Sequence, residues 1–317
     1  MYKTKEPHRR GSQQGVPIQM NALRDIVVVL DDSASSEVRL TLAVALAQQH
    51  GAHLTGLSAL DLLMPARPVG RPRGSPAMDT LSEPQLLNWG AAPPVGYPEA
   101  DAQVAEKAEG MEAEFRQRLR LGGLQGDWRM ASSKVSETVV FQARHADLVI
   151  LGQNDPDHPP PPAGRQLAAD VLMNSGRPIL VVPYVGRFET FGTKILVGWN
   201  SSREAVRAVN DAIPLLAKAT SVTILEAFST GRKPATDGAT SADIARHLAR
   251  HGIAAEITRT GMDGIAASDA LLSYAADISA DLLVIGGYGH SRLRELILGG
   301  VTRELLQHMT LPVLMSH

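Results

Sequence analysis

An internal repeat is the feature that most limits how this chain can fold. Two short apolar segments each occur twice, 134 residues apart: DLVILG at 147–152 with DLLVIG at 281–286, and RPILVV at 177–182 with LPVLMS at 311–316. The opening apolar runs at Ile26 and Ile195 are instead 169 residues apart, so the first copy holds 35 additional residues. This spacing predicts a tandem duplication of one folding unit with a single insertion.

Each copy alternates short runs of Val, Ile and Leu with longer helical patterns. We expect strands at 25–31, 53–60, 127–131, 148–151, 179–183, 194–200, 221–227, 254–260, 282–286 and 313–316. Such alternation is typical of strand–helix–strand units, and continuous apolar strands indicate a parallel sheet covered on both faces. The predicted fold is α/β, with two tandem, doubly wound, Rossmann-like domains. We expect five parallel strands in each domain, and the order 3-2-1-4-5 would bring the ends of strands one and four to one crevice.

Composition sets the expected domain boundaries. Residues 1–22 carry a surplus of Lys and Arg without periodicity, so we expect a disordered leader. The first domain is expected at 23–186 and the second at 192–317. The extra residues of the first copy fall at about 63–97, where frequent Pro and Gly predict a long loop. This loop is either a lid or a segment without a function of its own.

Charge and residue usage exclude several classes of function. A formal net charge of -2 gives no positive field for nucleic acid or an anionic membrane, and 4% aromatics are too few for a base-stacking platform. The chain has 0 Cys, which rules out disulfides and cysteine nucleophiles and fits a reducing cytoplasm. No apolar run approaches the ~20 residues that span a bilayer.

The strongest local signal is a glycine-rich turn between a strand and a helix in the second copy. Glycines stand at 286, 289, 299 and 300, where they let the backbone approach a ligand closely. Amides of such a turn, beside a helix N-terminus, bind phosphate without a basic surface. The first strand ends at Gly198 and Asn200, across the predicted crevice, where the Asn200 amide can donate and accept toward a base or ribose.

The spacing G-x2-G-x9-G followed by a small residue, within GGYGHSRLRELILGGVTRELL, resembles the universal stress protein family. The resemblance covers the chain from about Leu23 onward as two tandem domains. It implies ATP, with Mg as a possible companion, bound at the crevice. It also implies pairing of domains through the fifth strand, hence an internal pseudo-dimer, and it leaves open a further homodimer of whole chains.

The resemblance assigns two sets of contacts. Base or ribose contacts are expected from Gly198, Asn200 and Ala227. Phosphate contacts are expected from Gly286, Gly289, Gly299, Gly300, Val301 and Thr302, while His290 and Ser291 open the loop and could touch phosphate. The chain departs from the family pattern at Asn200, where an acidic residue is usual, and at Gly300, where Ser or Thr is usual.

The first copy lacks this loop. Its counterparts of Gly289, Gly299, Gly300 and Thr302 are Asp155, Arg165, Gln166 and Ala168, and prolines 159–162 remove four amide donors. Asp31 keeps the acidic position at the end of the first strand. We therefore expect the first domain to serve packing and dimerisation.

Catalysis has weaker support in the sequence. The neighbours His290 and Ser291 suit phosphate contact or capping better than nucleophilic chemistry, and G-x-S-x-G and P-loop motifs are absent. His247 and His251 have metal-ligand spacing but no third ligand, so no catalytic or metal residue is assigned. The predicted function is an ATP-binding stress-response switch with little or no catalysis. A nucleotide-free stress scaffold and a slow ATPase are the alternatives.

Overall fold

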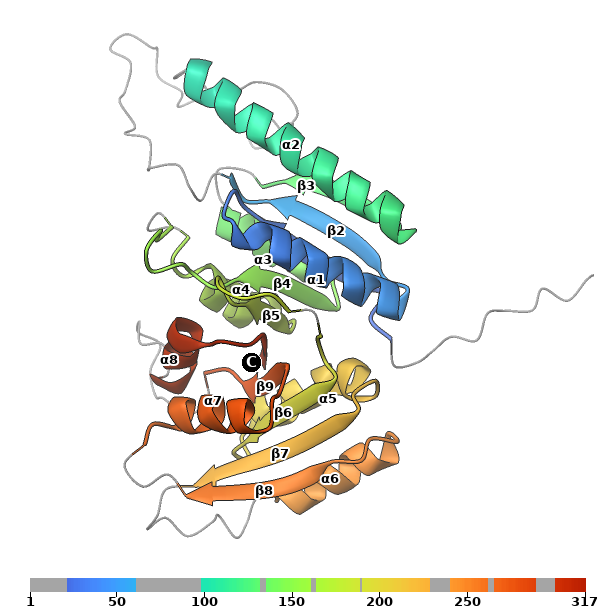
Figure 1. Ribbon diagram of the computed structural model, residues 1–317, viewed down its shortest axis with the longest axis vertical. Helices are drawn as coiled ribbons and strands as arrows, with labels where there is room; N and C mark the ends of the chain where they lie inside the picture. The colour runs from blue at the N-terminus through green and yellow to red at the C-terminus, as the bar shows by residue number, and fades with distance from the viewer. Residues whose placement is uncertain are drawn as a thin grey trace, which may run out of the picture.

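The computed structural model (Figure 1) describes residues 22–60, 98–131, 135–160, 164–188, 190–228, 240–261, 265–288 and 300–317. The first half contains β1 (Asp25–Leu30), α1 (Ser35–His50), β2 (His53–Ser58), α2 (Pro98–Gly122), β3 (Gly126–Met130), α3 (Val135–Ala143), β4 (Leu148–Gly152), α4 (Leu167–Ser175) and β5 (Ile179–Val182). The second half contains β6 (Lys194–Trp199), α5 (Arg203–Leu216), β7 (Ser221–Phe228), α6 (Ser241–Arg250), β8 (Glu256–Gly261), α7 (Ala267–Asp277), β9 (Leu282–Gly286), α8 (Gly300–His308) and β10 (Val313–Ser316).

All ten predicted strands are present, and no strand end differs from its predicted position by more than two residues. Nearly all of the expected leader at 1–22 and the whole insertion at 63–97 lie outside the described residues. The predicted junction between the domains falls between the end of β5 at Val182 and the start of β6 at Lys194. None of the helices in the described segments has the length and apolar character that crossing a membrane requires.

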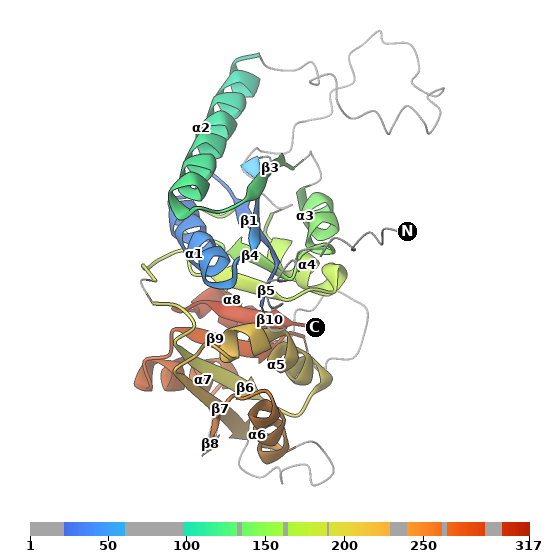
Figure 2. The same ribbon diagram turned by 90° about the vertical axis from the view of Figure 1, so that its right-hand side faces the viewer.

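The strands form one sheet of ten, in the order β3-β2-β1-β4-β5-β10-β9-β6-β7-β8. Within each half the strands are parallel and follow the order 3-2-1-4-5, which confirms the predicted α/β fold. The two halves join where β5 and β10 pair antiparallel, with Val181 opposite Val313 and Ile179 opposite Met315 (Figure 2).

Helices cover both faces of this sheet, which explains the continuous apolar strands. Alternate residues of β1 belong to different cores: Ile26 and Val28 to the core that includes residues of α1, α2, α5 and α6, and Val27 and Val29 to the core that includes residues of α3, α4, α7 and α8. In the first half, α1 and α2 lie on one side of the strands, and α3 and α4 lie on the other (Figure 2). Each core runs through both halves.

His50 lies buried in a contact between the halves at the end of α1. Its Nδ1 accepts a 3.4 Å hydrogen bond from the Leu23 amide, and Lys218 of the second half donates a 2.5 Å hydrogen bond to the Gln49 carbonyl beside it. Burial, with the charge of Lys218, lowers the pKa of His50 from its ordinary 6.5 to about 4. The folded protein therefore holds a neutral imidazole at neutral pH.

This shift makes the stability of the fold depend on pH. The unfolded chain takes up a proton at His50 below pH 6.5, whereas the folded chain does so only near pH 4. The free energy of unfolding is therefore highest above pH 6.5 and falls as the pH is lowered from 6.5 to 4. We predict that wild type loses about 1–2 kcal/mol more than His50→Gln between pH 7 and pH 4.5, allowing for solvent screening near Lys218. Denaturant unfolding at the two pH values measures the difference, and parallel losses in both proteins would refute it.

Candidate functional site

A crevice opens in the second domain where the sheet order reverses. Its strands β6 and β9 are paired as far as Val197 and Val284 and separate beyond these residues. The cavity there has a volume of about 180 Å³. It is lined by Gly198, Trp199, Asn200, Leu225, Ala267, Leu271, Ile285, Gly286, Tyr288, Gly300, Val301 and Thr302. This is the edge at which parallel α/β sheets bind ligands.

The structure brings together six of the predicted site residues, namely Gly198, Asn200, Gly286, Gly300, Val301 and Thr302. Gly289, His290, Ser291, Gly299 and the side chain of Ala227 lie outside the described part of the chain. Sequence reasoning missed the apolar wall, which Leu225, Leu271 and Ile285 provide, and it missed Tyr288. The position of Tyr288 inside the glycine-rich segment was the available signal.

The glycines of the motif have different structural roles. A Cβ on Gly286 would lie 2.4 Å from the Ala205 backbone nitrogen and 2.5 Å from the Glu204 carbonyl carbon, because α5 begins directly against the end of β9. A Cβ on Gly300 would have nothing within 4 Å. Gly286 is therefore required by packing, whereas Gly300 leaves open space in the crevice.

Two polar side chains of the site already support the backbone. The Asn200 Oδ1 atom accepts a 3.1 Å hydrogen bond from the Ser202 amide, so this side chain meets a ligand chiefly as a donor through Nδ2. The hydroxyl of Thr302, a buried residue, accepts a 3.2 Å hydrogen bond from the Tyr288 amide. This bond joins the first turn of α8 to the turn that follows β9.

The crevice carries no charged side chain among its described lining residues. Burial, with the negative charge of Asp170 in α4, raises the pKa of Tyr288 to about 12, so its phenol stays protonated. The Tyr288 hydroxyl is buried and has no hydrogen-bond partner within the described segments. An anion here would be bound by the backbone amides of the α8 N-terminus and by neutral donors.

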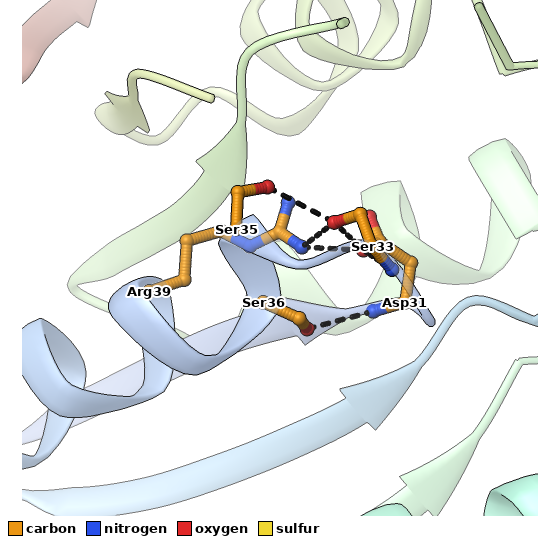
Figure 3. Close-up of polar contacts among 5 residues, drawn as sticks. All are labelled: Asp31, Ser33, Ser35, Ser36 and Arg39. Carbon is orange, nitrogen blue, oxygen red and sulfur yellow. Dashed lines mark hydrogen bonds and ion pairs between the residues drawn. The ribbon is translucent and has the colours of Figure 1, made fainter. Parts of the chain in front are cut away.

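The first domain retains a crevice at the corresponding place, with a volume of about 460 Å³. A buried ion pair lies in it: Arg39 Nη2 is 2.6 Å from Asp31 Oδ1, and the Arg39 side chain is only 3% exposed (Figure 3). Gly152 makes room for this guanidinium, because a Cβ there would lie 1.7 Å from Arg39 Nη1. The repeat offset pairs Arg39 with Ala208, a signal that sequence reasoning missed.

The same ion pair fixes the protonation state of Asp31. Burial raises the pKa of this carboxyl, but the charge of Arg39 and the hydrogen bonds from Ser33 and Arg39 outweigh burial, so the pKa lies below its ordinary range. The Ser36 hydroxyl also accepts a 3.1 Å hydrogen bond from the Asp31 amide (Figure 3). The acidic residue singled out from the sequence therefore has a structural partner within its own domain.

The two histidines at the end of α6, His247 and the capping residue His251, have other neighbours than metal ligands in the described segments. His247 Nε2 lies 3.1 Å from Asn210 Oδ1, and the His247 ring contacts the His251 ring edge-on at 4.8 Å. In the segments that the structure describes, no group of three His, Asp or Glu residues is arranged to hold a metal ion.

The unequal glycines lead to a prediction. Gly286→Ala places a methyl group against backbone atoms and should lower the free energy of unfolding by about 1–3 kcal/mol. Gly300→Ala has room and removes a helical glycine, so it should leave stability unchanged or raise it by up to about 1 kcal/mol. Denaturant unfolding of both variants tests this, and equal effects would contradict the packing role of Gly286.

The Asp31–Arg39 ion pair leads to a second prediction about stability. Asp31→Asn leaves a buried guanidinium without its counter-charge and should destabilise the protein by about 1–3 kcal/mol, whereas Asp31→Asn with Arg39→Met removes both charges and should recover at least half of the loss. A double-mutant cycle from thermal or denaturant unfolding gives the coupling. Additive losses would show that the pair carries no mutual stabilisation.

Comparison with known proteins adds independent findings. Residues 193–317 match the universal stress protein family model. A universal stress protein of Synechocystis sp., Slr1230, is 42% identical over 48 residues; the match spans 15% of this chain and only 17% of that protein.

Two solved structures match the chain over most of its length. The universal stress protein of Archaeoglobus fulgidus DSM 4304 has a TM-score of 0.64 at 15% identity, covering 94% of this chain and 98% of that one. A candidate universal stress protein from Pseudomonas aeruginosa UCBPP-PA14 has a TM-score of 0.56 at 17% identity, covering 94% of both chains. At this identity the likeness shows the fold alone. The match to the universal stress protein family therefore lies in residues 193–317, and the first half repeats the same strand order.

Proposed function

We propose that the second-domain crevice binds an adenine nucleotide, with ATP the principal candidate, and that binding acts as a switch in a stress response. One observation carries this proposal. The first turn of α8, with Gly300, Val301 and Thr302, lies opposite Gly198 and Asn200 at a crevice whose described lining residues are uncharged. A helix N-terminus supplies the positive potential and amide donors that phosphate groups need, so the site requires no lysine or arginine.

The described residues suggest how the ligand would lie. Leu225, Leu271 and Ile285 offer an apolar wall for a base, and Asn200 Nδ2 is a neutral donor. A volume of about 180 Å³ is below the ~300 Å³ of typical small-molecule sites, so it suits the base and ribose better than a whole nucleotide. The phosphates would extend along the α8 N-terminus.

The same residues argue against rapid catalysis as the function. No carboxylate is present among the described lining residues, so a magnesium ion would be held mainly by the phosphates of the nucleotide. A general base for water is likewise missing from this set. The first domain, whose crevice carries the Arg39–Asp31 pair, would serve packing through the β5–β10 ladder. The proposed place of action is the cytoplasm.

Substitutions at Gly300 test the proposal directly, because a side chain fits there. Gly300→Asp places a carboxylate beside the phosphate position and should weaken ATP binding at least tenfold by repulsion. Gly300→Asn has nearly the same shape without the charge, so it should bind ATP within about threefold of wild type. Isothermal titration calorimetry with and without magnesium measures all three proteins.

Each alternative function has its own outcome. Absence of ATP binding by wild type at millimolar concentration would reject the proposal and favour a nucleotide-free scaffold. Steady phosphate release by wild type, lost in Gly300→Asp, would favour a slow ATPase. Equal affinities of the Asp and Asn variants would place the phosphates away from α8.

A further inference from the structure

The side chain of Gln153 links the two crevices. Gln153 follows β4 directly, is only 6% exposed and lines the first-domain crevice. Its Nε2 group donates hydrogen bonds of 3.0 and 3.1 Å to the carbonyl oxygens of Leu306 and Gln307 in α8 of the second domain. Its Oε1 atom accepts a 3.2 Å bond from the Tyr184 amide. This amide therefore joins the two halves of the chain.

The two bonded carbonyls belong to the last turn of α8, where a helix lacks partners for its carbonyl groups. The first turn of the same helix lines the second-domain crevice through Gly300, Val301 and Thr302. A helix of nine residues is about 14 Å long and stiff over that length. The position of the first turn of α8 at the crevice therefore depends on the contacts that hold its last turn.

Other contacts connect α4 with the turn after β9. Leu172 of α4 packs against Gly287 so closely that a Cβ there would lie 2.6 Å from Leu172 Cδ2. The charge of Asp170, two residues before Leu172 in α4, acts on Tyr288. Tyr288 lines the second-domain crevice and has a left-handed backbone with φ 58, unusual for a residue other than glycine. The first domain thus contacts both the turn after β9 and the last turn of α8.

We infer that Gln153 is a positioning residue for the second-domain site: it fixes α8 from the first domain and so couples the geometry of the two crevices. Gln153 itself does not contact the ligand in this proposal. Its effect passes along α8 to Thr302 and from the Thr302 hydroxyl to the Tyr288 amide. Only the consequence for nucleotide affinity rests on the proposed function.

Amide hydrogen exchange tests the coupling without any ligand. Gln153→Met keeps the shape of the side chain and removes its hydrogen bonds. We expect at least tenfold faster exchange both in the α8 amides of residues 304–308 and at the Tyr288 amide. The α6 amides should be unchanged. Gln153→Asn, whose amide is one methylene shorter, should show the same pattern to a smaller degree and serves if the Met variant folds poorly.

Gln48→Met is the matched control. Gln48 Nε2 donates a 3.1 Å hydrogen bond to the carbonyl of Gly122 at the end of α2, the same type of contact within one domain. Its loss should speed exchange near the end of α2 and leave α8 and Tyr288 unchanged. Faster exchange confined to the last turn of α8 in Gln153→Met, with Tyr288 unaffected, would overturn the coupling and leave Gln153 a local helix cap.

Calorimetry with ATP gives a separate answer. If wild type binds ATP, Gln153→Met should weaken binding about fivefold or more, and Gln48→Met should not. If wild type binds no ATP, the proposed function fails, while the exchange at Tyr288 still decides whether Gln153 positions the crevice. The two hypotheses can therefore fail independently.

Discussion

The antiparallel pairing of β5 with β10 is the interaction on which the rest of the architecture depends. Both strands are fully buried, and their ladder turns two five-stranded sheets into one sheet with a continuous core on each face. Unpaired backbone groups at either edge would be costly in such surroundings. The pairing also places β4 and α4 of the first domain beside α8 and the turn after β9, so the domains share the contacts around the second-domain crevice.

One topology has produced two chemically different crevices. In the second domain a cavity whose described lining is uncharged meets a helix N-terminus, whereas in the first a buried arginine and an aspartate neutralise each other. Strand order explains why a crevice exists in both places. Side chains decide what each can bind, which is why a shared fold does not imply a shared ligand.

Residues of a binding motif can be needed for reasons other than the ligand. Gly286 is fixed by the approach of α5, and the oxygens of Asn200 and Thr302 hold backbone amides. Among the motif glycines that the structure describes, only Gly300 has space around it that packing does not require. A glycine pattern therefore combines folding and binding requirements, and substitutions that the structure tolerates are needed to separate them.

The sequence by itself determined the repeat and all ten strands and, once the strand order 3-2-1-4-5 was taken, the meeting of Gly198 and Asn200 with Gly286 and Gly300. These features depend on local apolar patterns and on the rule that parallel strands end at one edge. The tertiary structure alone decided the ion pair of Arg39 with Asp31, the wall formed by Leu225, and the bonds from Gln153 to α8. Those contacts join residues from different elements, and Gln153 lies more than 150 residues from its partners. Which side chain fills a shared space depends on packing in three dimensions, and no periodicity along the chain records it.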